Sequence, residues 1–64
     1  MSRSARLLQL LDTLRRARQP QAGPQLAQDL GVSLRTLYRD IATLRGQGAD
    51  ILGDPGLGFE MRPG

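Results

Sequence analysis

The first third of the chain has leucines at helical spacing. They follow the i, i+3, i+4, i+7 pattern of an amphipathic helix and form one broad apolar stripe: Leu7, Leu8, Leu10, Leu11 and Leu14. Ser2 or Ser4 can cap this helix, and Pro20 ends it because proline cannot continue a helix. We therefore expect a helix over about residues 3–18, followed by a linker over residues 19–23.

Two further helices are predicted on either side of a tight turn. Pro24 lies at a first helical position, where its missing N–H costs nothing, and Gly31 supplies the left-handed residue that helix ends favour. Ser33 follows almost at once and is a good N-cap. We expect helices over about residues 24–30 and 34–45. Two helices joined by a turn of about three residues with a glycine are typical of a helix-turn-helix.

After the third helix, Gly46 and Gly48 stop the helical pattern and two short extended segments follow. Their apolar residues are Ile51, Leu52, Phe59 and Met61. The intervening Asp54-Pro55-Gly56 is typical of a turn, so we expect a β-hairpin, or wing, over about residues 50–62. The fold predicted for residues 1–64 is a single winged helix-turn-helix domain of three helices, mainly α with a small β-hairpin.

The composition argues against an enzyme. The 64 residues include no cysteine and no histidine, so thiolate and imidazole metal ligands and the commonest general base are missing. The carboxylates lack the spacing of a calcium loop. We therefore expect a binding module that uses no cofactor and no metal. The sequence has no apolar run of about 18 residues and no signal-peptide pattern, which predicts no membrane partner and a cytoplasmic location in a bacterial-type cell.

The charge of the chain suggests an acidic partner. The formal net charge is +3, and all nine basic residues are arginine. The planar guanidinium can pair bidentately with a phosphate or with a guanine edge. A compositional bias towards arginine explains the same observation equally well, so the placement of the arginines on the predicted helices has to decide.

The third predicted helix has two unlike faces. One side is an apolar stripe made of Leu34, Leu37, Ile41 and Leu44. The opposite side has the polar residues Arg35, Thr36, Arg39 and Thr43. Burial of the stripe against the first two helices leaves the polar face in solvent, where a helix-turn-helix contacts the major groove of DNA.

Each residue near this face has chemistry that suits double-stranded DNA. Arg35 and Arg39 lie one helical turn apart and can reach guanine edges or phosphates, and Thr36 can contact a base. Ser33 can contact a phosphate together with the N–H groups of the helix start. Tyr38 can pack its ring while its hydroxyl reaches a phosphate.

The start of the first helix adds two candidates for phosphate contact. Arg3 and Arg6 lie where cations oppose the helix dipole, a placement that makes sense if they meet phosphate, although chance also explains it. The polar face of the third helix has a plain alternative as well: its arginines can be ordinary solvated charges, with Arg39 beside Asp40. Tyr38 can equally be a core residue without a role in nucleic-acid binding.

A different class of function is a protein-interaction or dimerisation module. Winged helices also serve as docking units, and the leucine-rich first helix could pair with a copy of itself to form a homodimer. RNA binding is disfavoured, because the chain has one tyrosine and one phenylalanine for base stacking.

Several motifs resemble the N-terminal domain of the WYL-domain (DeoR-like) bacterial transcription regulators. The run Val32-Ser33-Leu34-Arg35-Thr36-Leu37-Tyr38-Arg39-Asp40-Ile41 is similar to their helix-turn-helix, and Gly56-Leu57-Gly58-Phe59 is similar to their hairpin. This resemblance implies a C-terminal effector-sensing domain and a dimer in the intact protein. One departure is Asp54 at the wing tip, where an acidic side chain repels phosphate. We therefore expect at most backbone contacts to DNA, from the N–H groups of Gly56 and Gly58.

Overall fold

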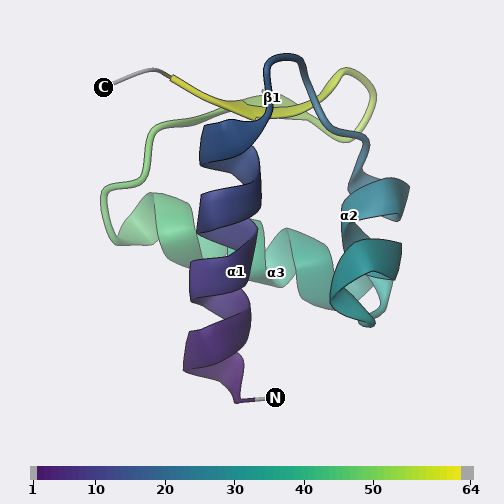
Figure 1. The fold of residues 1–64 in the computed structure, drawn as a ribbon, viewed down its shortest axis with the longest axis vertical. Coiled ribbons are helices and arrows are strands. Elements are labelled where there is room, and N and C mark those ends of the chain that lie inside the picture. Colours follow the sequence, from purple (N-terminus) through teal and green to yellow (C-terminus); the bar gives the residue numbers. More distant parts are fainter. Residues whose placement is uncertain (1, 63–64) are drawn as a thin grey trace.

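Three helices and a β-hairpin make up the computed structural model, which describes residues 2–62 (Figure 1). In chain order the elements are α1 (Arg3–Arg16), α2 (Gly23–Leu30), α3 (Leu34–Gly46), β1 (Ile51–Asp54) and β2 (Gly58–Met61). β1 and β2 pair antiparallel, with Ile51 opposite Met61 and Asp54 opposite Gly58. This arrangement confirms the predicted three-helix winged helix-turn-helix.

The first helix is shorter than the sequence predicts. Ser2 is its N-cap, and its side-chain oxygen accepts a 3.1 Å hydrogen bond from the backbone N–H of Ala5. The helix ends at Arg16 instead of about residue 18, because Ala17 already has an extended backbone.

The linker between α1 and α2 is more ordered than the sequence indicates. Gln21 forms an antiparallel bridge with Phe59 of β2, through N–O hydrogen bonds of 2.7 Å and 2.8 Å in the two directions. Through this single bridge, the predicted linker pairs with the β2 edge of the wing. No local signal for a strand is present in this glutamine- and proline-rich segment, because its partner lies 38 residues further along the chain.

The turn between α2 and α3 follows its local sequence signals. Gly31 is left-handed, with φ 68°, and the backbone N–H of Val32 bonds to the carbonyl of Ala27 at 3.0 Å. Ser33 then caps α3, accepting a 3.1 Å hydrogen bond from the N–H of Thr36. As predicted, the turn therefore lies between a glycine C-cap on α2 and a serine N-cap on α3.

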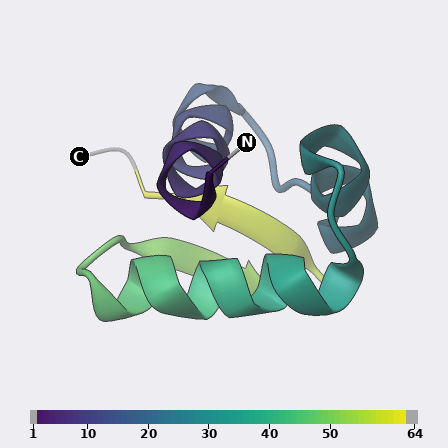
Figure 2. The same ribbon diagram turned by 90° about the horizontal axis from the view of Figure 1, so that it is seen from below.

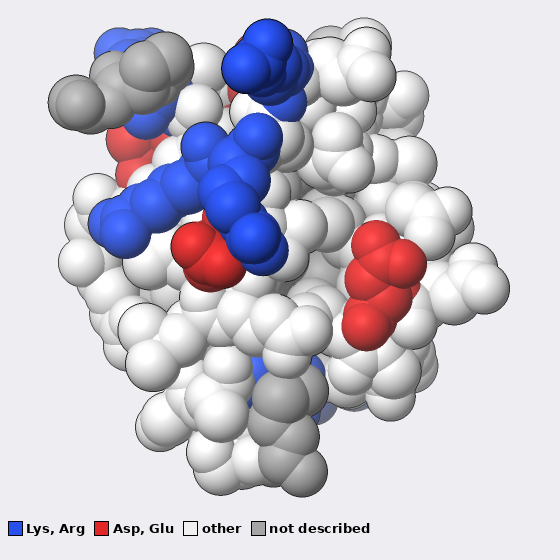
Figure 3. All heavy atoms as spheres, in the orientation of Figure 1, with Lys and Arg blue, Asp and Glu red and all other residues white. Residues whose placement is uncertain are grey.

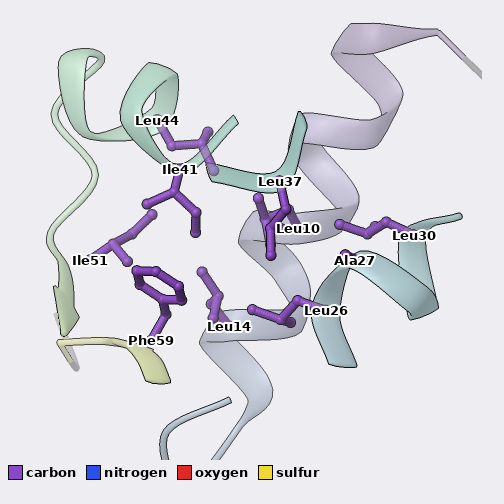
Figure 4. Packing of buried hydrophobic residues seen from close by; sticks show 10 residues of the cluster. All are labelled: Leu10, Leu14, Leu26, Ala27, Leu30, Leu37, Ile41, Leu44, Ile51 and Phe59. Atoms are coloured by element: carbon purple, nitrogen blue, oxygen red, sulfur yellow. The ribbon is translucent and has the colours of Figure 1, made fainter. Parts of the chain in front are cut away.

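One hydrophobic core holds all of these elements together (Figure 4). Its buried side chains come from every helix and both strands: Leu10, Leu14, Leu26, Ala27, Leu30, Leu37, Ile41, Leu44, Ile51 and Phe59. The helical pattern predicts that Leu34 is buried with Leu37, Ile41 and Leu44, but Leu34 is 39% exposed because it lies at the very start of α3, at the edge of the core. Phe59, only 2% exposed, places the wing against the helices. Within residues 2–62, no helix is long and apolar enough to cross a membrane.

Candidate nucleic-acid interface

The third helix lies along one side of the molecule, with α1 and α2 on its inner side (Figure 2). Its buried residues are Leu37, Asp40, Ile41 and Leu44. On the other side of the helix, Arg35 and Arg39 are exposed and Thr36 is half-buried. We call Arg35, Thr36, Arg39 and Thr43 the outer face of α3. The structure therefore separates the two faces as the sequence predicts.

At the start of this helix, two hydroxyl groups lie next to each other. The Ser33 hydroxyl donates a 3.1 Å hydrogen bond to the Thr36 hydroxyl oxygen while it caps the helix. Ser33 is exposed, and the unpaired backbone N–H groups of a helix start attract anions. This end of α3 can therefore accept a phosphate and can also offer the Thr36 hydroxyl to a base edge.

The start of α1 meets the outer face of α3. The guanidinium of Arg3 donates a 3.1 Å hydrogen bond from Nη2 to the hydroxyl oxygen of Thr43. Thr43 in turn donates a 3.0 Å hydrogen bond to the carbonyl of Arg39, one turn earlier. Thr43 therefore links an arginine of α1 to the outer face, and it keeps the exposed Arg3 beside that face.

Arg6 forms an ion pair with a buried aspartate. Its Nε and Nη2 donate hydrogen bonds of 2.6 Å and 3.2 Å to the two carboxylate oxygens of Asp40. The Asp40 side chain is fully buried and that of Arg6 is 19% exposed. The hydrogen bond to Asp40 raises the pKa of Arg6 above its ordinary value, against the opposing effect of desolvation. Asp40 therefore forms its ion pair with Arg6 of α1 and not with the adjacent Arg39.

The sequence contains a signal for one member of this pair, Asp40. Asp40 follows Leu37 by three residues and precedes Leu44 by four, so it lies in the same helical row as two apolar residues. A carboxylate in such a row needs a buried cationic partner. The local pattern does not identify that partner, because Arg6 lies 34 residues away.

Tyr38 packs at the junction of α3, α2 and the wing. Its ring centroid lies 6.0 Å from that of Phe59, with the rings tilted by 56°. A Cβ atom at Gly23 would come within 3.0 Å of the Tyr38 hydroxyl oxygen, so glycine at this position makes room for the ring. Tyr38 is half-buried, in agreement with its predicted packing role.

The wing tip is closed by its own aspartate. The carboxylate Oδ1 of Asp54 accepts 2.9 Å hydrogen bonds from the backbone N–H groups of both Gly56 and Leu57. The expected contact from the Gly56 N–H to DNA therefore needs correction, because that N–H is already bonded within the turn. Gly58 is buried against the carbonyl of Gln21, which removes it from the tip surface.

Comparisons with known proteins agree with this geometry. The family model described as HTH domain matches residues 6–60, which is most of the chain. The chain belongs to this helix-turn-helix family. It is also 40% identical over 53 residues to the probable transcription repressor NiaR of Thermotoga maritima, an overlap of 83% of this chain and 30% of that protein. The chain thus spans about a third of the length of this relative. The WYL-domain context is not part of what these matches show.

In this helix-turn-helix domain, a further arginine has a role that sequence analysis missed. Arg45, in the last turn of α3, donates hydrogen bonds of 3.0 Å to the carbonyl of Ile51 and 2.9 Å to that of Gly53. Its guanidinium carbon lies 5.7 Å from the centroid of the Phe59 ring, a cation–π geometry. Arg45 therefore fixes the wing to the end of the helix. A basic residue in a last helical turn is common, so its sequence position alone does not reveal this contact.

The remaining arginines of the domain extend its positive charge to the side opposite α3. Figure 3 looks onto α1 with α3 behind it, and basic side chains gather there over the second half of α1. Two exposed ion pairs offset part of this charge: Arg16 lies 3.0 Å from Asp12, and Arg62 lies 3.2 Å from Asp50. Positive charge is therefore not confined to the outer face of α3, which is distinguished instead by its hydrogen-bonding groups.

Proposed function

We propose that this domain binds double-stranded DNA sequence-specifically, as the DNA-binding part of a bacterial transcription regulator, with α3 in the major groove. The observation that supports this most strongly is the asymmetry of α3. Its inner side is buried by the core, including the fully buried Asp40, while Arg35 and Arg39 point away from it and are exposed. A helix held rigidly on one side and polar on the other is suited to groove recognition.

Direct contacts to bases fall to the first two turns of α3. Arg35 and Arg39 can each pair bidentately with guanine O6 and N7, or with flanking phosphates. Thr36 can donate its hydroxyl to a base, because its oxygen already accepts from Ser33. Ser33 and the N–H groups beside it can hold a phosphate.

Phosphate contacts around this centre fall to residues on neighbouring elements. Arg3, hydrogen-bonded to Thr43, lies beside the outer face and can contact the DNA backbone. Tyr38 can direct its hydroxyl to a phosphate while its ring stays packed. For Arg6 we propose a positioning role instead of a phosphate contact, because two of its nitrogens bond to Asp40.

The biological setting of this activity is also a proposal. The resemblance to WYL-domain regulators supports an effector-sensing domain elsewhere in the intact protein, and the relative from Thermotoga maritima is much longer than this chain. A regulator of this kind acts where the bacterial chromosome is, in the cytoplasm, and most such regulators bind DNA as symmetric dimers. Recognition of DNA needs no catalytic group and no cofactor, so we do not propose an enzymatic activity.

Selection of bound duplexes from a random pool tests this function. We expect one enriched sequence, with an observed affinity that falls by about 0.9 log units per phosphate contact for each tenfold rise in salt. Enrichment of no sequence, together with binding that ignores salt, would instead support the alternative of a protein-interaction module.

A further inference from the structure

A small cleft separates the third helix from the wing. Its volume is about 120 Å³, and its lining comes from α3 and from the hairpin: Tyr38, Ile41, Ala42, Arg45, Pro55 and Phe59. We call this hollow the α3–wing cleft. Its lining is mostly apolar, with the charge of one arginine, and it includes none of the residues that make up the outer face of α3.

The α3–wing cleft lies on one flank of the outer face of α3. Around the helix axis, Ala42 on the wing side and Asp40 on the α1 side are each about 80° from the middle of that face. On the α1 side, Arg3 reaches the outer face through its bond to Thr43. The major groove is bordered by two phosphate backbones, so a helix that lies in it meets one backbone on each flank. The backbone on the wing side therefore passes the α3–wing cleft.

Arg45 has N–H groups available for this backbone. Its bonds to the carbonyls of Ile51 and Gly53 use two of the five N–H groups of a guanidinium, and within residues 2–62 the others have no partner. The residue is exposed, although these two bonds and the Phe59 ring fix the direction of its side chain. A guanidinium that is already held in place loses little conformational freedom when it binds an anion.

We propose that the α3–wing cleft binds one sugar–phosphate unit of the DNA backbone, with Arg45 donating to the phosphate and the apolar lining packing against the deoxyribose. This inference rests on the proposed function, since it concerns the backbone beside the groove that α3 occupies. The cleft suits this ligand because a nucleotide joins an anionic phosphate to a sugar ring whose surface is mostly C–H groups. Such a contact carries no base information, so it adds affinity to every duplex alike.

The carboxylate of Asp54 at the wing tip does not exclude a phosphate from this cleft. Asp54 is not one of the lining residues, although Pro55, which follows it, is. Its Oδ1 accepts hydrogen bonds from the N–H groups of Gly56 and Leu57 within the turn, and these donors offset part of its negative charge. The anion-binding group on the wing side is therefore Arg45 of α3, and not a side chain of the wing tip.

The test replaces single phosphates of the selected duplex by neutral methylphosphonates, one position at a time. For the parent, we expect a loss of affinity at each phosphate that the domain contacts. Arg45→Ala should bind the selected and a scrambled duplex about tenfold less tightly, with a salt slope smaller by about 0.9. In this variant the effect of the methylphosphonate should vanish at one position, on the strand that borders the wing side, and stay the same at the others.

Because Arg45 also anchors the wing, a second variant leaves its contacts in place. Ala42→Glu adds a carboxylate to the cleft at an exposed position of α3, and Gln9→Glu is the matched control, because it adds the same charge at an exposed position of α1. We expect Ala42→Glu to bind about tenfold less tightly and to regain most of this loss when the phosphate identified with Arg45→Ala is neutral. Gln9→Glu should follow the pattern of the parent at every position.

The two variants should identify the same phosphate. If neither responds to any single position, or if they respond to different positions, the cleft does not bind the backbone and Arg45 only anchors the wing. Should Arg45→Ala fail to fold, Ala42→Glu decides alone, because a loss that no neutral phosphate relieves overturns the proposal. A parent that selects no sequence and ignores salt would instead contradict the proposed function, so the two failures can be told apart.

Discussion

Arg6 on α1 and Asp40 on α3 form a two-point ion pair, with 2.6 Å between Nε and Oδ2 and 3.2 Å between Nη2 and Oδ1. The Asp40 side chain is fully buried one residue after the exposed Arg39 of the outer face. The pair therefore joins α1 to α3 directly beside the outer face of α3. It lies on the same side of α3 as the buried Leu37 and Leu44, so it adds to the contacts that hold this side against the core.

Removing the charge of Asp40 should destabilise the domain. Asp40→Asn weakens the hydrogen bonds to Arg6 and leaves part of a buried polar site unsatisfied, at a cost of about 1–3 kcal/mol. For a domain of this size, each kcal/mol corresponds to roughly 4–8 °C in Tm, measured by circular dichroism.

The matched control for this change is Asp12→Asn. Asp12 pairs with Arg16 on the surface, where the two side chains are 61% and 74% exposed. We expect its loss to alter stability by less than about 1 kcal/mol. An equal fall in Tm for the two variants would show that the Arg6–Asp40 pair does not hold α1 against α3.

Replacing Arg45 should loosen the wing. Arg45→Ala removes two hydrogen bonds to the carbonyls of Ile51 and Gly53, together with the contact to Phe59. We expect a loss of about 1–2 kcal/mol and faster amide hydrogen exchange in the hairpin than in α2. Arg45→Lys should not restore protection, because an ammonium cannot span both carbonyls and stack on the ring. Hairpin exchange unchanged in Arg45→Ala would contradict this role.

Two glycines should respond in opposite directions to alanine. Gly53 has φ 102°, and a Cβ there would lie 1.9 Å from the carbonyl oxygen of Gly58, so Gly53→Ala must distort the hairpin. At Gly46, in the last turn of α3, a Cβ meets nothing within 4 Å. Gly46→Ala should therefore stabilise the domain by about 0.5–1 kcal/mol. Denaturant unfolding measures both changes; a stabilised Gly53→Ala variant would refute the close approach of the two strands.

Features fixed by neighbouring residues could be predicted from the sequence. Gly31 and Ser33 determine the α2–α3 turn through a left-handed backbone and a side-chain cap, and both are readable within a few positions. The separation of Arg35 and Arg39 from the apolar stripe of α3 follows from helical periodicity in the same way.

Features made by distant parts of the chain were not found from the sequence. The Gln21–Phe59 bridge and the contacts of Arg45 both depend on where the hairpin folds back. The wing tip lies between these two cases. Asp54 indicates a turn from the sequence, but only the structure shows that the N–H of Gly56 bonds to the Asp54 carboxylate within that turn. In each case the partner is set by tertiary packing, which local spacing does not encode.

Recognition of DNA by the outer face of α3 is tested most directly by the affinity of Arg39→Ala for the selected duplex and for a scrambled one, across a range of salt concentrations. Arg16→Ala is the matched control, since Arg16 is exposed on α1 and pairs with Asp12. We expect Arg39→Ala to lose about 1–3 kcal/mol on the selected duplex and much less on the scrambled one, while Arg16→Ala keeps the preference of the parent. If Arg39→Ala binds both duplexes as the parent does, α3 is not the element that distinguishes one DNA sequence from another.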